Sequence, residues 1–164
     1  MRRWLAIAGA TVAIAVLAAG CGGNTSSSSS STPASSSATA TGGATVAVKS
    51  SKLGAILVDG TGRTLYLFEK DQGTSSSCYG ACAGGWPPDT TNGAPRAGAG
   101  VSASLLGTTT RTDGKTEVTY HGHPLYYFAG DRKPGDTNGE GIKAFGAEWY
   151  VLSAAGNKVK QERS

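Results

Sequence analysis

Two aspartates end two copies of one short pattern and could supply the paired carboxylates of an acid–base site. Each copy reads Tyr-x-Phe-x-x-Asp, and the two copies, sixty positions apart, end at Asp71 and Asp131. Two carboxylates brought together across an approximate two-fold axis would suit a hydrolase. Each Asp also follows a predicted strand, where a carboxylate accepts backbone N–H bonds and fixes a turn. The turn-fixing role is favoured, and a hydrolase that uses Asp71 and Asp131 is the alternative.

The pattern is part of an internal repeat. In both halves a Gly and a Leu precede the Tyr at the same offsets, and a Trp follows later, at Trp86 and Trp149. Such a repeat indicates one structural unit that is built twice. The motif residues are Tyr66, Phe68, Asp71, Tyr126, Phe128 and Asp131. We predict an architectural motif whose side chains could also line a ligand surface.

The only two histidines, His121 and His123, are one residue apart. In an extended segment such side chains point to the same side, so both imidazoles could bind one copper or zinc ion. Thr61 and Arg63 occupy the matching positions of the first half, so the histidines are not part of the repeat. Two polar residues in an exposed turn are therefore the favoured interpretation, with metal binding as the alternative.

A glycine-rich segment after the second motif has oxygen-bearing side chains at alternate positions, as calcium loops do. These are Asp136, Asn138 and Glu140, but no acidic residue closes the loop at the required distance. The neighbouring Arg132 and Lys133 also oppose cation binding. A glycine-rich turn is the favoured interpretation.

Composition gives little support for catalysis or for nucleic-acid binding. The chain has no Gly-x-Ser-x-Gly, no phosphate-binding loop, no dinucleotide fingerprint and no haem Cys-x-x-Cys-His. Without residues 1–20 it has 13 basic and 11 acidic side chains, a net charge of +2. Nucleic-acid binding needs clustered Lys and Arg with interleaved aromatic residues, and no such cluster is present. We expect no cofactor unless the histidines bind copper or zinc.

The N-terminus has the pattern of a bacterial export signal. Two arginines precede an apolar run, Trp4–Ala19, which is short for a membrane-spanning helix. Residues 1–20 are therefore predicted to be a signal peptide that is cleaved before Cys21, in a sequence similar to a lipobox. Cys21 would carry the lipid, including palmitate, and anchor the protein in the membrane with the domain outside the cytoplasm. Residues 22–43 are almost all Gly, Ser, Thr and Ala, which predicts a disordered tether.

The other two cysteines, Cys78 and Cys82, form an even pair in an exported chain. The oxidising side of the membrane favours a disulfide between them. A redox dithiol usually has two intervening residues rather than three, and a zinc site needs two further ligands. A structural disulfide that fixes a local turn is the favoured interpretation.

The mature chain has the patterns of an all-β protein. Short apolar runs at residues 46–48 and 55–58, a hairpin signal at Asp113–Gly114 and alternation over Thr116–Tyr120 predict antiparallel strands. The motif segments, at residues 63–69 and 125–128, are apolar on both faces, which predicts strands in the interior. We predict one β domain over residues 44–164, built from two repeats at about 52–90 and 105–153. Each repeat is pictured as an antiparallel β-meander, and the two pack as a small sandwich or barrel-like domain.

The motifs resemble a family of exported bacterial lipoproteins with a duplicated secreted repeat and a Tyr-x-(Phe/Trp/Tyr)-x-x-Asp motif. The similarity extends over about residues 52–153, including the segments Cys78–Ala83, Pro124–Asp131 and Gly146–Tyr150. It implies an exported location and the doubled architecture, and it implies no reaction.

The sequence therefore predicts a lipid-anchored cell-envelope protein that acts as a non-catalytic binding or structural module. Its partners would be the membrane, through the anchor, and an envelope protein or a small ligand. A metal-binding or electron-transfer accessory lipoprotein and the hydrolase are the alternatives.

Overall fold

The computed structural model of the chain describes residues 42–160. The predicted signal peptide, Cys21 and the tether up to residue 41 lie outside this range, as do residues 161–164. The elements are β1 (Thr45–Ser51), β2 (Gly54–Asp59), β3 (Tyr66–Phe68), α1 (Ala81–Gly85), β4 (Arg96–Ala97), the 3-10 turn η1 (Ala103–Leu105), β5 (Leu106–Thr110), β6 (Thr116–Tyr120), β7 (His123–Pro124), β8 (Lys143–Ala144) and β9 (Ala147–Val151).

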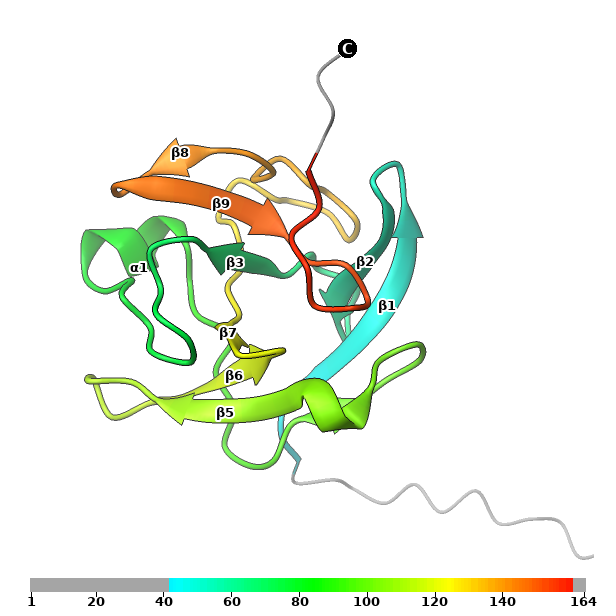
Figure 1. Ribbon diagram of the computed structural model, residues 1–164, viewed down its shortest axis with the longest axis horizontal. Helices are drawn as coiled ribbons and strands as arrows, with labels where there is room; N and C mark the ends of the chain where they lie inside the picture. The colour runs from blue at the N-terminus through cyan, green and yellow to red at the C-terminus, as the bar shows by residue number, and fades with distance from the viewer. Residues whose placement is uncertain (1–41, 161–164) are drawn as a thin grey trace, which may run out of the picture. The chain divides into compact units, whose positions relative to one another are not determined.

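The strands form three small sheets, with the orders β2-β1-β4, β3-β9-β8 and β5-β6-β7. All pairings between these strands are antiparallel except that of β1 with β4. Figure 1 shows β3 near the middle of the domain, with β9 on one side and β7 on the other. The predicted all-β, sandwich-like architecture is confirmed, and the described sheets do not close into a barrel.

Each repeat begins as the predicted meander. In the first, β1 and β2 form a hairpin, and Val58 then bridges Thr64 on the returning segment. In the second, β5 and β6 form the matching hairpin, and β6 pairs with β7. The two hairpins therefore place the two motif segments in equivalent positions.

Each motif segment then pairs with the opposite repeat. The prediction of two separate meanders did not include this pairing. Strand β3 of the first repeat pairs along its length with β9, the last strand of the second. Tyr126 of the second repeat bridges Pro88, at the end of the first. The two motif segments also bridge each other, because Tyr66 N donates to Tyr126 O at 2.8 Å and Tyr126 N donates to Tyr66 O at 3.0 Å. Each repeat is thus completed by the other.

The motif segments separate two hydrophobic clusters, as their doubly apolar pattern predicted. Tyr66 and Phe68 lie in one cluster with both tryptophans, whereas Leu65 and Leu67 lie in the other with Val118. Successive side chains of an extended segment point to opposite faces, so a single segment contributes to both cores. This arrangement fixes the motif side chains from two sides.

The second predicted motif strand differs in the structure. Residues 125–128 are not a continuous strand, because only Tyr126 is bridged and the regular pairing ends at Pro124, which has no N–H to donate. The segment between the two repeats contains β4, which pairs in parallel with β1. The same segment is followed by η1, which ends at Leu105, directly before β5.

Candidate functional site

The two motif tyrosines bind the motif aspartates of the opposite repeat. Tyr66 Oη donates to Asp131 Oδ2 at 2.6 Å, and Tyr126 Oη donates to Asp71 Oδ2 at 2.8 Å. We call Tyr66–Asp131 and Tyr126–Asp71 the crossed pairs. They have approximate two-fold symmetry about the Tyr66–Tyr126 bridge, which explains why the same spacing of Tyr and Asp occurs twice.

The second oxygen of each aspartate fixes its own loop. Asp71 Oδ1 accepts bonds from the backbone N and from Oγ of Ser77, both at 2.7 Å. Asp131 Oδ1 accepts a bond from the backbone N of Asn138 at 2.9 Å. Each motif carboxylate therefore links the loop that follows it to the other half of the domain.

Four aromatic rings form a continuous stack in which the two repeats alternate. In order along the stack they are Phe68, Trp149, Trp86 and Phe128, and we call them the aromatic stack. The ring centroids are 4.0, 4.0 and 4.4 Å apart, and the first two contacts are nearly parallel. The edges of Tyr66 and Tyr126 meet Trp86 and Trp149 at 5.3 and 5.1 Å. The Trp that follows each motif thus has the same place in the fold as its counterpart.

Burial supports an architectural role for the four aromatic residues of the motif. Tyr66, Tyr126 and Phe68 are buried, and Phe128 is half-buried against the same cluster. Burial raises the pKa of both tyrosines, so their hydroxyls stay protonated and donate. Burial also raises the pKa of Asp71 and of Asp131, against the opposing effect of the hydroxyl and N–H donors.

The two motif carboxylates have no hydrogen-bond partner in common within residues 42–160. Asp71 binds Tyr126 and Ser77, whereas Asp131 binds Tyr66 and Asn138. The contacts hold each carboxylate in a separate loop, and none joins them in a shared cleft. These hydrogen bonds give the hydrolase alternative no support, and it stays a prediction.

His123 lies beside Phe68 and Asp71 of the first motif, although it is not part of the repeat. It is half-buried and lines a surface depression of about 520 Å³ with Phe68 and Asp71. Burial, followed by the neighbouring His121, lowers the pKa of His123. His121 is exposed and has a positive φ of 51°. Within residues 42–160 no group of three or more His, Cys, Asp or Glu side chains is arranged to hold a metal ion, and metal binding by His121 and His123 stays a prediction.

A buried ion pair lies next to the crossed pair Tyr126–Asp71, and the sequence patterns did not predict it. Arg111 Nη1 donates to Glu117 Oε2 at 2.8 Å, and neither side chain is exposed. The same guanidinium donates to Ser76 Oγ and to the Cys78 carbonyl, both at 2.6 Å. Tyr126 gives its one hydroxyl proton to Asp71, so Ser76 donates to Tyr126 Oη, 2.6 Å away. We call this series, from Arg111 through Ser76 to Tyr126, the buried polar chain.

The alternation of Glu117 with Val118 and Tyr120 predicts that Glu117 lies on a polar face of β6. That face is buried as well, and the carboxylate is fully enclosed with Oε1 unpartnered among the described residues. Burial raises the pKa of Glu117 to about 7 despite the nearby guanidinium. No local pattern marks such a residue, since the loop that covers it comes from residues 76–78 of the other repeat.

The disulfide between Cys78 and Cys82 is confirmed. It lies at the start of α1, where Cys82 N donates to Tyr79 O at 3.1 Å. Both cysteines are buried beside the aromatic cluster. By closing this short loop the disulfide holds the Cys78 carbonyl where Arg111 binds it.

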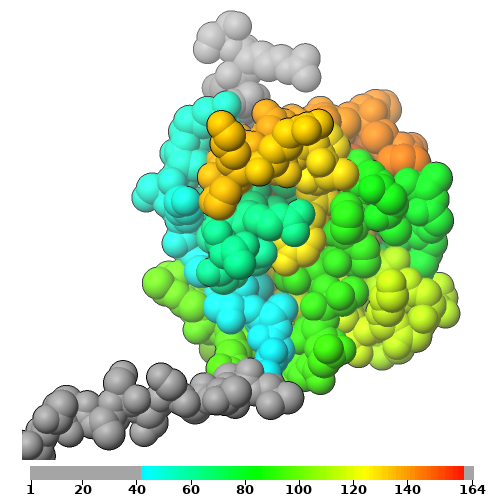
Figure 2. Space-filling model, turned by 180° about the vertical axis from the view of Figure 1, so that it is seen from behind, coloured from blue at the N-terminus to red at the C-terminus, as the bar shows by residue number. Residues whose placement is uncertain are grey.

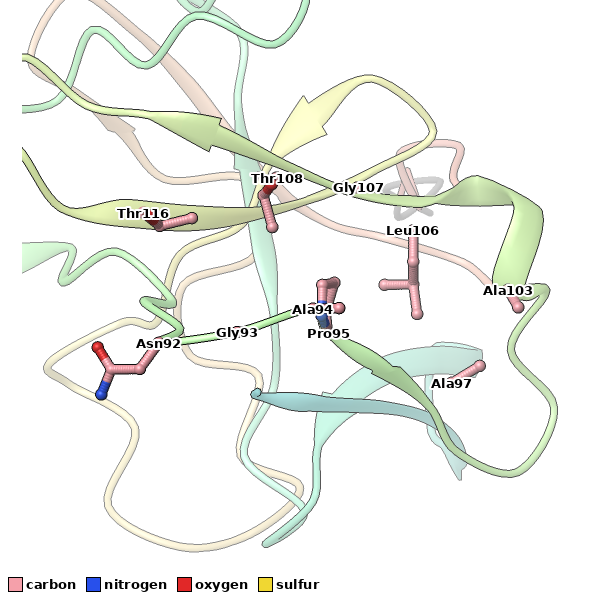
Figure 3. A pocket seen from close by; sticks show the side chains of 10 residues that line it. All are labelled: Asn92, Gly93, Ala94, Pro95, Ala97, Ala103, Leu106, Gly107, Thr108 and Thr116. Atoms are coloured by element: carbon pink, nitrogen blue, oxygen red, sulfur yellow. The ribbon is translucent and has the colours of Figure 1, made fainter. Parts of the chain in front are cut away.

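Another depression, of about 550 Å³, lies between the segment Asn92–Ala97 and the edge of β5. Figure 3 shows its walls, with Pro95 and Leu106 on facing sides and Thr108 and Thr116 at one end. Its lining residues are small, apolar or neutral polar, and none has a titratable side chain. The depression therefore has none of the groups that general acid–base chemistry requires.

The buried carboxyl group of Asp89 makes the stability of the domain depend on pH. Its side chain is 2% exposed, Oδ1 accepts the Tyr127 hydroxyl at 2.9 Å, and Oδ2 has no partner among the described residues. Burial raises its pKa from 3.8 to about 6. The folded state therefore holds a proton that the unfolded state has released between these two values, so stability is highest below the ordinary pKa and falls as pH rises through the folded one.

We expect the free energy of unfolding to increase when pH is lowered from about 7.5 to about 5, with about 1 kcal/mol of the increase due to Asp89. Urea unfolding at several pH values measures the change. Asp89→Asn removes the ionisable group and should reduce the increase by that amount, while Glu117 continues to act in the same direction. An unfolding free energy that falls on acidification over this range, or an Asp89→Asn chain with an unchanged pH profile, would contradict the prediction.

Comparison with known proteins identifies a family through the repeat. Its sequence matches a family that is described as a secreted repeat of unknown function, at residues 47–89 and again at residues 107–153. Each match includes one copy of the motif, and together they cover more than half of the chain. No curated protein and no solved structure matches it. Among residues 42–160, no helix has the length and apolar content needed to cross a bilayer. The resemblance seen in the doubled motif is confirmed, and the chain belongs to this family of secreted repeats.

Proposed function

We propose that this protein is a lipid-anchored module of the bacterial cell envelope that acts by binding, without catalysis of its own. The family is described as secreted, which supports export. The apolar run that ends at Ala19-Gly20-Cys21 supports the anchor, because a lone Cys directly after a signal peptide is the residue that receives lipid. The tether of residues 22–43 would have a root-mean-square span of roughly 25 Å and separate the domain from the headgroups.

The engagement of both motif carboxylates is the observation that carries the non-catalytic assignment. Each motif aspartate accepts bonds from a tyrosine hydroxyl and from its own loop. Within the described residues these bonds connect the two repeats, and each carboxylate would have to release its partners before it could act as a base. The crossed pairs are therefore best interpreted as the device that holds the two repeats together.

Replacing Cys21 with alanine tests the anchor. Without the thiol no lipid can be attached, so we expect the protein to move from the membrane fraction to the medium or periplasm with its domain folded. Fractionation followed by immunoblotting measures the distribution. Cys78→Ala/Cys82→Ala is the matched control, because it removes thiols that form a disulfide and should leave the protein in the membrane fraction. If the Cys21→Ala chain stays in the membrane fraction as the parent does, the anchor is absent and the proposal is wrong.

A further inference from the structure

A polar depression lies between the β1–β2 hairpin and the loop that follows the second motif. Its volume is about 390 Å³, and its walls are Lys49–Lys52 on one side and Pro134–Asn138 on the other. Figure 1 shows these two segments next to each other, and Figure 2 shows the same neighbours, in cyan and orange-yellow, from behind. We call it the hairpin depression. The side chains of Lys49, Lys52 and Thr137 take no part in the crossed pairs or in the aromatic stack.

Positive charge dominates the hairpin depression. Lys49 and Lys52 line it, and neither forms an ion pair with another of the described residues. The one acidic residue in the lining, Asp136, is engaged by its own loop, because its Oδ2 accepts the backbone N–H groups of Arg132 and Lys133, both at 3.0 Å. The two lysines are thus left to attract a negatively charged ligand.

The position of Lys49 is set by two glycines. Gly62 and Gly135 have φ values of 87° and 85°, which side chains rarely tolerate, and Gly135 N donates to Gly62 O at 2.9 Å. A Cβ on either glycine would lie 3.6 or 3.8 Å from Lys49 Nζ. The ammonium therefore rests beside bare backbone, with no side chain of these residues to cover it.

A buried hydroxyl without a partner lies in the same wall. Thr137 is 9% exposed and lines the depression, and its Oγ1 makes no hydrogen bond to any described residue. A buried hydroxyl without a partner carries a desolvation cost, so such groups are usually satisfied by a ligand, a water or another side chain. Ser50 and Asn138 supply further polar groups at the rim. The lining thus combines two ammonium groups with neutral donors.

We propose that the hairpin depression binds a phosphate group. Phosphate carries several acceptor oxygens, which suits a site with two ammonium groups and neighbouring hydroxyls. The group could be free inorganic phosphate or the phosphate ester of a lipid headgroup, since both have the same chemistry. This proposal rests on the binding role proposed above and gives it a ligand class and a location. It does not depend on the lipid at Cys21.

The solvent exposure of Lys49 and Lys52 determines the affinity that we expect. Solvent screens such charges, so the affinity for inorganic phosphate should be in the millimolar range and should weaken as salt is added. A headgroup phosphate would be presented at high local concentration to an anchored protein, and weak binding then suffices.

Backbone amide chemical shifts of the Cys21→Ala chain without residues 1–20 provide the test, with inorganic phosphate as the probe at constant ionic strength. We expect saturable shifts at Lys49–Lys52 and Thr137–Asn138, and about tenfold weaker binding in Lys49→Gln/Lys52→Gln. Thr137→Val removes the hydroxyl at nearly constant shape and should also weaken binding, with the remaining spectrum unchanged. Lys70→Gln/Lys143→Gln is the matched control and should bind as the parent does. Lys143 belongs to β8, and Lys70 donates to the Phe145 carbonyl between β8 and β9, away from the hairpin depression.

Vesicles distinguish the two sources of phosphate. Sedimentation with phosphatidylglycerol vesicles but not with phosphatidylcholine vesicles, lost in Lys49→Gln/Lys52→Gln, identifies a headgroup; phosphate binding without sedimentation identifies the free ion. Shifts of equal size on the control face, or binding that is unchanged in Lys49→Gln/Lys52→Gln, would overturn the proposal. Because the test chain has no lipid, such a failure removes the ligand class and leaves the result of the Cys21→Ala fractionation unaffected.

Discussion

Replacing Trp149 with alanine is expected to lower the free energy of unfolding by about 3–5 kcal/mol. Its indole lies between Phe68 and Trp86, 4.0 Å from each ring centroid, and its Nε1 donates to the Ala144 carbonyl at 3.3 Å. Removal leaves a cavity in the middle of the aromatic stack, between side chains of the first repeat that cannot close it without moving β3. Trp86→Ala should cost a similar amount, because it occupies the equivalent place.

Urea unfolding followed by far-ultraviolet circular dichroism measures this loss. Phe145→Ala is the matched control, because Phe145 is 46% exposed and its removal should change stability by no more than about 0.5 kcal/mol. A Trp149→Ala domain that loses less than about 1 kcal/mol would show that the aromatic stack does not hold the repeats together.

Replacing Arg111 with methionine is expected to cost about 3–5 kcal/mol. The change leaves the carboxylate of Glu117 fully buried without its counter-charge, and it also removes the donors to Ser76 and to the Cys78 carbonyl. Ser76 and Cys78 belong to the first repeat, whereas Arg111 belongs to the second, so the loss should also loosen the loop that follows the first motif.

A second substitution separates the buried charge from the lost packing. Arg111→Met/Glu117→Leu removes both members of the pair, so it should be clearly more stable than Arg111→Met alone, since no unpaired charge remains. Arg132→Met is the control for loss of an arginine, because Arg132 is exposed. If the double variant is less stable than Arg111→Met by the full cost of Glu117→Leu, the two side chains act independently and the ion pair has no structural role.

Local sequence patterns were sufficient to predict strands and to assign the two faces of the first motif segment. Thr116–Tyr120 was predicted with the bounds that the structure gives β6, because a turn signal precedes it and alternation marks its length. The doubly apolar pattern of residues 65–68 correctly placed Leu67 and Phe68 in different hydrophobic clusters. The Cys78–Cys82 disulfide followed from their number and from the predicted export.

The crossing of the repeats could not be predicted in the same way. The partner of Tyr66 is 65 residues away, and nothing in the residues near Tyr66 distinguishes Asp71 of its own motif from Asp131 of the other. The prediction of two separate meanders paired strands that are neighbours in the sequence, whereas β3 pairs with β9. Glu117 was missed for a related reason, because its burial depends on Arg111 and on a loop of the other repeat.

The crossed pairs give the doubled motif a physical meaning. The Tyr of each copy donates its hydrogen bond to the Asp of the other copy. Loss of either residue should therefore weaken the contact between the two repeats. The aromatic stack has the same alternation.

A double-mutant cycle on the motif tests the crossing most directly. We measure the free energy of unfolding of Tyr66→Phe with Asp131→Asn, and compare it with Tyr66→Phe combined with Asp71→Asn. The structure predicts a coupling of about 1 kcal/mol for Tyr66 with Asp131, which are 2.6 Å apart, and values near zero for Tyr66 with Asp71. Coupling confined to Tyr66 and Asp71, within one copy of the motif, would contradict the interlocked arrangement.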